Sequence, residues 1–179
     1  LVRRSGEILA SYRHNHYREL PAEEQSFSIR VVASRDGGLT WEPHSTVDSV
    51  TGTTHGLWAS FLLETRDGRL QCYYDDEVTP WREGLGRHQW VTMRTWNPAT
   101  GAWEDPVTVS RAHHPADLSR DGMPTVIELP SGRLLCVFES VDVEHPFKGV
   151  LRQVTSDDGG RTWSWQHAER RIVWRPPDR

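Results

Sequence analysis

The sequence has few cysteines, no long apolar run and no excess of basic residues, and each shortage excludes a class of protein. Two cysteines among 179 residues cannot form a disulfide scaffold, and no Cys/His pattern has the spacing of a zinc site. No run of about eighteen apolar residues occurs, so we expect no membrane span. The formal net charge is -4, from 25 acidic and 21 basic residues, so we expect no nucleic-acid partner.

The start of the chain lacks an initiating methionine and an apolar targeting segment. It opens with Leu1-Val2-Arg3-Arg4, and residues 172–177 at the other end resemble a strand that enters a turn. We therefore expect a fragment of a longer protein. The 179 residues correspond to one ordinary domain, and nine tryptophans with many aliphatic residues provide apolar surface for a core.

A repeat organises the chain. The sequence Ser-Arg-Asp-Gly-Gly-Leu-Thr-Trp at residues 34–41 recurs as Ser-Asp-Asp-Gly-Gly-Arg-Thr-Trp at residues 156–163, and a degraded copy ends near the midpoint at Trp103. A second element, a turn glycine followed by a β-forming run, recurs with the same period at Gly6, Gly68 and Gly132. Two independent markers with one period indicate three repeats, which we place near residues 1–50, 51–112 and 113–179.

Each repeat is expected to form four short strands. Asp-Gly and Ser-Gly turns join β-forming runs into hairpins, and no segment combines helical periodicity with caps. All-β repeats of this length predict a β-propeller of four-stranded blades. A propeller needs roughly four to eight blades to close, so we interpret residues 1–179 as half of a six-bladed propeller. Open sheet edges would favour self-association of a chain this short.

The recurring Ser-x-Asp-x-Gly-x-x-Trp motif is interpreted as a folding element. Its Ser and Asp side chains can bond nearby backbone amides, so we expect Asp36 and Asp158 to be structural. Cys72 and Cys136 fall at equivalent strand positions, which predicts two buried free thiols too far apart to pair. The tryptophans that end the three copies are expected in the core: Trp41, Trp103 and Trp163.

Acidic residues follow two of the runs that begin after the glycines, and we expect these runs to be the innermost strands. The same offset from each glycine reaches Arg13, Asp75 and Glu139. Carboxylates from neighbouring blades at one level of a channel could flank a glycosidic bond, as its hydrolysis requires. The alternative is that these acids, Asp75 above all, are solvated loop residues.

Other polar and aromatic residues are candidates for binding. Arg120 and Asp121 are expected either to bind substrate hydroxyls or a carboxylate, or to steady a turn. His113, His114 and Asp117 lack a further ligand at metal-site spacing, so we expect no metal and no cofactor. Aromatic rings that could stack on a sugar face are Trp58, Tyr74, Trp81 and Trp90.

The recurring motifs are Asp boxes, and with them the chain resembles the sialidase superfamily of six-bladed propellers. More specific segments resemble glycoside hydrolase family 93, exo-acting α-1,5-L-arabinanases that release arabinobiose. The resemblance spans nearly the whole chain but only about half of such an enzyme. The segments that carry it are Gly56-Leu57-Trp58, Tyr74-Asp75-Asp76-Glu77, Arg120-Asp121-Gly122-Met123-Pro124 and Val137-Phe138-Glu139.

The resemblance implies a retaining, exo-acting glycoside hydrolase with Glu77 and Glu139 as its catalytic carboxylates, Glu77 as nucleophile and Glu139 as acid/base. One departure stands out, because Ala59-Ser60 follows Gly-Leu-Trp where relatives have Glu-Pro. This difference predicts altered specificity or loss of activity. The expected substrate-binding residues are Asp76, Arg120, Asp121, Trp58, Tyr74 and Arg13.

Two other functions stay open. A sialidase would need an arginine triad that grips a carboxylate, and Arg13 and Arg120 could supply part of it. A non-catalytic propeller that binds glycans or proteins is favoured by Ala59 and by the degraded middle copy. The resemblance further implies an oligo- or polysaccharide partner and a secreted or extracellular protein.

Overall fold

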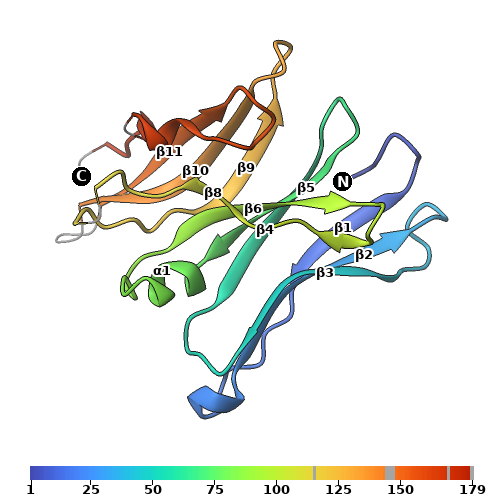
Figure 1. Cartoon of the computed structure of the whole chain (residues 1–179), viewed down its shortest axis with the longest axis horizontal. Coiled ribbons are helices and arrows are strands. Elements are labelled where there is room, and N and C mark those ends of the chain that lie inside the picture. Colours follow the sequence, from blue (N-terminus) through green and yellow to red (C-terminus); the bar gives the residue numbers. More distant parts are fainter. Residues whose placement is uncertain (115, 144–147, 169, 178–179) are drawn as a thin grey trace.

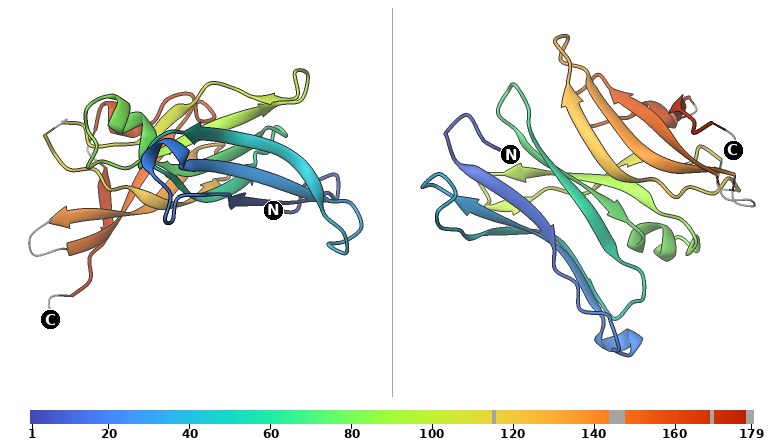
Figure 2. Two further views of the ribbon diagram at one scale, coloured as in Figure 1. Left: turned by 90° about the horizontal axis from the view of Figure 1, so that it is seen from below. Right: turned by 180° about the vertical axis from the view of Figure 1, so that it is seen from behind.

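The computed structural model describes residues 1–114, 116–143, 148–168 and 170–177, and within them the chain forms three antiparallel sheets. Figures 1 and 2 show that the sheets lie side by side in chain order, with the second between the first and the third. The expectation of an all-β chain is confirmed. Among the described residues, no helix has the length and apolar character needed to cross a membrane.

The first sheet has the order β1-β2-β3 and the third has the order β12-β11-β10-β9. The second sheet has the order β4-β5-β6-β7, and β8 also pairs with β6. The strands of the first sheet are β1 (Ile8–Arg13), β2 (Ser26–Ser34) and β3 (Glu42–Thr51). Those of the second are β4 (Leu57–Glu64), β5 (Leu70–Asp76), β6 (Trp90–Asn97), β7 (Ala102–Trp103) and β8 (Val107–Ser110). Those of the third are β9 (Gly122–Glu128), β10 (Leu134–Val143), β11 (Lys148–Ser156) and β12 (Arg171–Trp174).

The three short helices lie in connections. The only α-helix among the described residues is α1 (Val78–Arg82), between β5 and β6, and the 3-10 helices are η1 (Ala22–Glu24) and η2 (Ser164–Gln166). Tight glycine turns join the strands of two hairpins. Gly68 and Gly132 both have φ +86°, a left-handed conformation that residues with a side chain rarely adopt. They connect β4 to β5 and β9 to β10, as the Asp-Gly and Ser-Gly signals predict.

The expectation that the runs after the glycines are the innermost strands is wrong. β5 lies between β4 and β6, and β10 lies between β9 and β11, so both are second strands. β4 and β9 contact each other across neighbouring sheets. The physical reason is that each glycine turn connects the first strand of a sheet to the second. Before Gly6 the described chain supplies only an isolated bridge between Val2 and Ile8, which leaves the first sheet with three strands.

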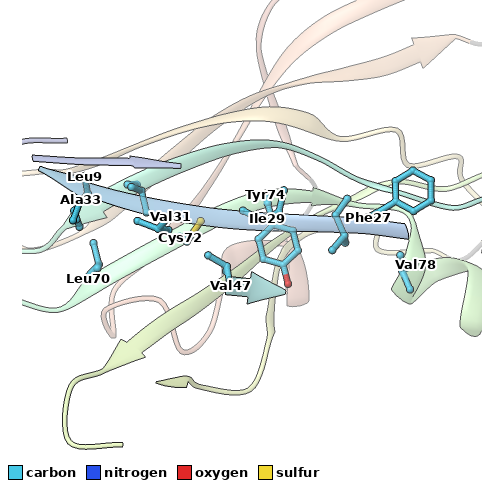
Figure 3. Close-up of a cluster of buried hydrophobic side chains, with 12 residues drawn as sticks. Leu9, Phe27, Ile29, Val31, Ala33, Val47, Leu70, Cys72, Tyr74 and Val78 are labelled. Atoms are coloured by element: carbon cyan, nitrogen blue, oxygen red, sulfur yellow. The ribbon is translucent and has the colours of Figure 1, made fainter. Parts of the chain in front are cut away.

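Two apolar cores form where neighbouring sheets face each other. Because side chains alternate along a strand, β5 contributes Cys72 and Tyr74 to the core shared with the first sheet and Tyr73 to the core shared with the third. Figure 3 shows the first core, where Ile29 and Val31 of β2 lie close to β5. Cys72 and Cys136 are buried free thiols in different cores, as predicted, and burial raises the pKa of both.

The predicted core positions of the three motif tryptophans hold only in part. Trp163 is 1% exposed and belongs to the second core, and Trp103 packs against the first core while half-buried. Trp41 is 45% exposed, so its predicted core position is wrong. Trp163 faces the preceding sheet, whereas Trp41 belongs to the first sheet, and no sheet precedes that one among the described residues.

Candidate functional site

A cavity of about 620 Å³ opens where the second and third sheets meet, near the end of β5. The loop before β9 is held against the loop after α1 by backbone hydrogen bonds from Gln89 N to Ser119 O (2.7 Å) and from Asp121 N to Gln89 O (3.0 Å). These bonds bring segments that are distant in sequence to one place. The cavity is lined by Asp75, Arg87, Gln89, Leu118, Arg120, Met123, Glu139, Ser140, Val141 and Gly149.

Asp75 is the buried carboxyl of this cavity. It is 4% exposed, and its Oδ1 accepts a hydrogen bond of 2.9 Å from the backbone N–H of Met123. The pKa of Asp75 is raised to about 7: burial is the main cause, the nearby charges of Glu139 and Glu77 add to the rise, and the backbone N–H groups of Met123 and Ala59 oppose it. A carboxyl with this pKa holds a proton close to neutral pH, so Asp75 can act as an acid. The alternative that it is a solvated loop residue is wrong.

The backbone beside Asp75 is constrained. A Cβ atom on Gly122 would lie 2.5 Å from Gln89 Nε2 and 3.1 Å from Asp75 Oδ2, so a side chain here would have to displace the end of Gln89. The next residue, Met123, has φ +51°, a left-handed conformation that is strained for a residue with a side chain. Such strain is found most often at functional sites.

Glu139 on β10 pairs with Gly122 on β9 and lines the same cavity. Its side chain is exposed, in contrast to that of Asp75. The register between β9 and β10 shifts between Val137 and Glu139, an irregularity that reorients a side chain at the end of a sheet. The two carboxyls that face this cavity thus come from neighbouring sheets, as the sequence predicts for paired acids.

Glu77 follows β5 directly and is held by three donors. Its Oε2 accepts hydrogen bonds from Trp58 Nε1 (2.8 Å) and Gly56 N (3.3 Å). Its Oε1 pairs with the Arg120 guanidinium at 2.9 Å. With 15% of its side chain exposed, Glu77 is a fixed anchor beside the cavity.

Arg120, Trp58 and Arg13 extend this network over three further segments. Arg120 lines the cavity, while the Arg13 guanidinium on β1 lies 5.6 Å from the ring centroid of Trp58 on β4, a cation–π distance. The structure therefore connects four sequence-predicted residues, Arg13, Trp58, Glu77 and Arg120, through direct contacts.

Three other predicted substrate-binding residues lie inside the protein. Tyr74 is fully buried and donates a hydrogen bond of 2.7 Å to Asp48 Oδ2. Asp76 is 2% exposed and accepts hydrogen bonds from the backbone N–H groups of Val78 and Thr79 at the start of α1. Their placement does not support direct contact with a substrate.

The third of these residues, Asp121, is fully buried. Its carboxylate pairs with Arg170 and accepts hydrogen bonds of 2.7 Å from Ser110 Oγ and Ser140 Oγ. This arrangement favours the turn-stabilising interpretation of Asp121 over substrate binding, while Arg120 reaches the cavity.

The aromatic side chains that could stack on a sugar also divide into buried and exposed ones. Trp90 is 1% exposed and lies beneath the Arg111 guanidinium, so its ring offers no free face. Trp81 on α1 is 40% exposed and stacks on His55 with ring centroids 5.2 Å apart. Of the rings proposed to stack on sugar, Trp81 presents the most exposed surface and Trp58 a partly buried one.

Sequence reasoning missed Arg87, Gln89 and Met123, which line the cavity. Arg87 and Gln89 belong to the loop after α1, where no repeat marker falls. Met123 was part of a quoted motif, but only its backbone N–H carries the contact to Asp75. Among the described residues, no group of three or more His, Cys, Asp or Glu side chains could hold a metal ion. His113, His114 and Asp117 line a separate cavity of about 460 Å³.

Comparison with known proteins identifies the fold. No protein-family model matches the sequence. No curated protein matches the chain. The family 93 α-L-arabinofuranosidase of Fusarium graminearum, solved with arabinobiose, has a TM-score of 0.70 at 23% identity over 94% of this chain and 45% of its own. The α-L-arabinanase of Penicillium chrysogenum, also solved with arabinobiose, has a TM-score of 0.65 at 24% identity over 87% and 42%. A Hadza microbial sialidase has a TM-score of 0.65 at 17% identity over 90% and 35%.

These matches are β-propellers, and the chain has the fold of part of such a propeller. They confirm the propeller fold that the resemblance to the sialidase superfamily implies. The chain spans less than half the length of each of these three proteins.

Proposed function

We propose that this chain carries part of the active site of a retaining, exo-acting glycoside hydrolase for arabinan or a related polysaccharide. The observation that carries the proposal is the convergence of carboxyl groups from two neighbouring sheets on one cavity. Asp75 and Glu139 line it, and Glu77 borders it through Arg120. Glycosidic bonds are cleaved by two carboxyl groups, one that protonates the leaving oxygen and one that acts as nucleophile or base.

The structural relatives support the same class of reaction. The arabinofuranosidase and the arabinanase were both solved with arabinobiose, a disaccharide of arabinose. The resemblance implies Glu77 and Glu139 as the catalytic pair; Glu139 lines the cavity, and Glu77 borders it through Arg120. Arg120 and Arg13 supply hydrogen-bond donors for sugar hydroxyls, and Trp58 and Trp81 supply apolar ring surface. Action on a polysaccharide is consistent with a secreted protein, which we retain as part of the proposal.

Substrate release separates this function from its alternatives. We expect liberation of arabinobiose from linear α-1,5-arabinan and no release of sialic acid from a chromogenic sialoside. Glu139→Gln removes one of the two catalytic carboxyls, so it should lower kcat by about 10²–10⁴-fold or more, with an unchanged melting temperature because the side chain is exposed. Arabinan binding without turnover by the unmodified chain would overturn the hydrolase and favour a binding module.

A sialidase is the second candidate because of Arg87 and Arg120. Both line the cavity, and guanidinium groups are well suited to an acidic sugar. However, Arg120 already pairs with Glu77, which leaves it less available to a substrate carboxylate. Release of sialic acid in the same assay would decide for this candidate.

A further inference from the structure

We propose that Asp75 is a catalytic residue that donates the proton to the leaving oxygen, that Glu139 is its partner carboxylate, and that Glu77 is a positioning residue. This inference rests on the proposed function and assigns roles within the same site. It differs from the roles expected from the sequence, in which Glu77 is the nucleophile and Asp75 is a solvated loop residue.

The first argument is where Asp75 lies on its strand. β5 alternates, so that Cys72 and Tyr74 face the first sheet while Tyr73 faces the third. Asp75 follows this alternation toward the third sheet, where the N–H of Met123 on β9 meets its carboxyl. It therefore lines the cavity from one side, and Glu139 on β10 lines it from the other.

The second argument is the role of Gly122, which lies between the two acids. It pairs with Glu139 in the register of β9 and β10, and a Cβ atom at this position would come within 3.1 Å of Asp75 Oδ2. The absence of a side chain at Gly122 therefore lets the Asp75 carboxyl and the end of the Gln89 side chain approach the strand that pairs with Glu139. The negative charge of Glu139 adds to the rise in the pKa of Asp75, as expected for a neighbouring carboxylate.

The third argument compares Asp75 with the other acids nearby. Asp121 pairs with Arg170, and Glu77 pairs with Arg120 and accepts a hydrogen bond from the Trp58 indole. The contacts of Glu77 with Arg120, Trp58 and Gly56 hold its carboxylate in place, which suits a positioning residue. Asp75 is held instead by backbone N–H groups, of Met123 and Ala59, and burial raises its pKa.

Ala59 adds an observation from the sequence. It stands where the resembled family has glutamate, and its backbone N–H bonds the carboxyl of Asp75. A carboxyl, that of Asp75, therefore lies against position 59 even though the residue there is alanine. We infer that the substitution at position 59 does not remove the acid from this site.

The reaction then runs in two balanced steps. In the first step, the O–H bond of Asp75 breaks as its proton passes to the glycosidic oxygen. The bond from that oxygen to the anomeric carbon breaks, and its electron pair stays on the oxygen. At the same time a Glu139 oxygen forms a bond to the anomeric carbon. In the second, the Asp75 carboxylate takes a proton from water, the water oxygen bonds the anomeric carbon, and the Glu139 ester bond breaks. Glu77 holds Arg120 and Trp58 in place throughout.

The test uses two substrates that differ in leaving group, linear α-1,5-arabinan and 4-nitrophenyl α-1,5-arabinobioside. Nitrophenolate leaves without protonation, so Asp75→Asn should lower kcat/KM on arabinan by about 10²–10⁴-fold and far less on the nitrophenyl substrate, while the loss of the base in the second step should lower kcat on both. In the unmodified protein, kcat/KM should fall above about pH 7 as Asp75 loses its proton, and this fall should be absent from Asp75→Asn. Glu77→Gln, the matched control, should raise KM on both substrates alike and keep the pH profile.

The outcomes separate the two proposals. If the unmodified chain hydrolyses arabinan, but Asp75→Asn retains its kcat and its pH profile, this inference is wrong and the hydrolase stands. If the unmodified chain cleaves neither substrate, the proposed function falls and the catalytic role of Asp75 falls with it. If Asp75→Asn does not fold, the carboxyl is followed in the unmodified protein by carbon-13 NMR, where titration near its ordinary value of 3.8 would overturn the inference.

Discussion

Trp41 and Trp163 make the same hydrogen bond in the same turn, yet they lie in opposite environments. Each indole Nε1 donates to a glycine carbonyl, Gly38 O and Gly160 O, at 3.1 Å. Trp163 is 1% exposed because Tyr73 of the preceding sheet meets its ring edge-on, with centroids 6.1 Å apart, whereas Trp41 is 45% exposed. The eight-residue motif therefore determines the turn, and a neighbouring sheet determines whether its tryptophan is buried.

This pair provides a matched stability experiment. Trp163→Ala should lower the free energy of unfolding by roughly 3 kcal/mol or more, because it empties a filled core position. Trp41→Ala removes the same hydrogen bond but little buried surface, so it should cost clearly less. Urea denaturation monitored by circular dichroism measures both, and equal losses would contradict the assigned burial.

Asp75→Asn should change how stability depends on pH. The folded-state pKa of Asp75 is raised to about 7 from 3.8, so the stability it contributes is fully present below about pH 4 and is lost as the pH rises through 7. Asparagine mimics the protonated carboxyl and does not ionise. At pH 8 the variant should therefore be more stable than the unmodified chain, by roughly 2 to 4 kcal/mol.

Thermal melting from pH 4 to pH 8 measures this effect, with Glu139→Gln as the exposed-carboxylate control. Parallel curves for Asp75→Asn and the unmodified chain would show that Asp75 ionises normally.

Asp36 and Asp158, the aspartates of the two turns, should make stability depend on pH in the direction opposite to that of Asp75. Hydrogen bonds from Thr40 and Ser34 lower the pKa of Asp36 to about 2. The pKa of Asp158 is also lowered to about 2, because hydrogen bonds from Thr162 and Ser156 outweigh the opposing effect of burial. Their contribution to stability is present above about pH 4 and is lost as the pH falls toward 2. Asp158→Asn should flatten the acid limb of a stability-against-pH curve, and an unchanged limb would refute this role.

Asp121→Ala should unfold the site rather than weaken substrate binding alone. It leaves Arg170, which is 8% exposed, without its carboxylate, and loss of one partner of a buried ion pair typically costs about 3–5 kcal/mol. The double variant Asp121→Ala with Arg170→Met should recover part of this loss, because it removes the uncompensated charge. A raised KM with unchanged stability would instead restore Asp121 as a substrate contact.

Self-association of this chain remains a prediction. Leu39 and Trp41 are 84% and 45% exposed on the first sheet, and Val173 and Trp174 are 41% and 53% exposed on the third. Within the chain, the outward side of one sheet is covered by the next, so we expect the third sheet of a second copy to cover the first. Sedimentation velocity should show a concentration-dependent average mass that Trp41→Arg lowers. A concentration-independent monomer would disprove this expectation.

The amino-acid sequence by itself determined the local structure. Glycine turns, β-forming runs and the Asp-Gly-Gly motifs specify hairpins and turns through contacts between residues close in the chain, such as the Ser156–Asp158 hydrogen bond of 2.8 Å. For the same reason the all-β class could be predicted. Glu139 was found because it ends an apolar run, and Glu77 was named from the family resemblance.

The tertiary structure decided everything that depends on a neighbouring sheet. The first strands of the second and third sheets, β4 and β9, contact each other, and neither of them is a strand that follows a turn glycine. The tertiary structure exposed Trp41, buried Asp121, and placed Asp75 against Met123 and opposite Glu139. Burial and proton affinity depend on the groups that surround a side chain in space, and here those groups lie far from Asp75 in sequence and reach it only when the sheets pack.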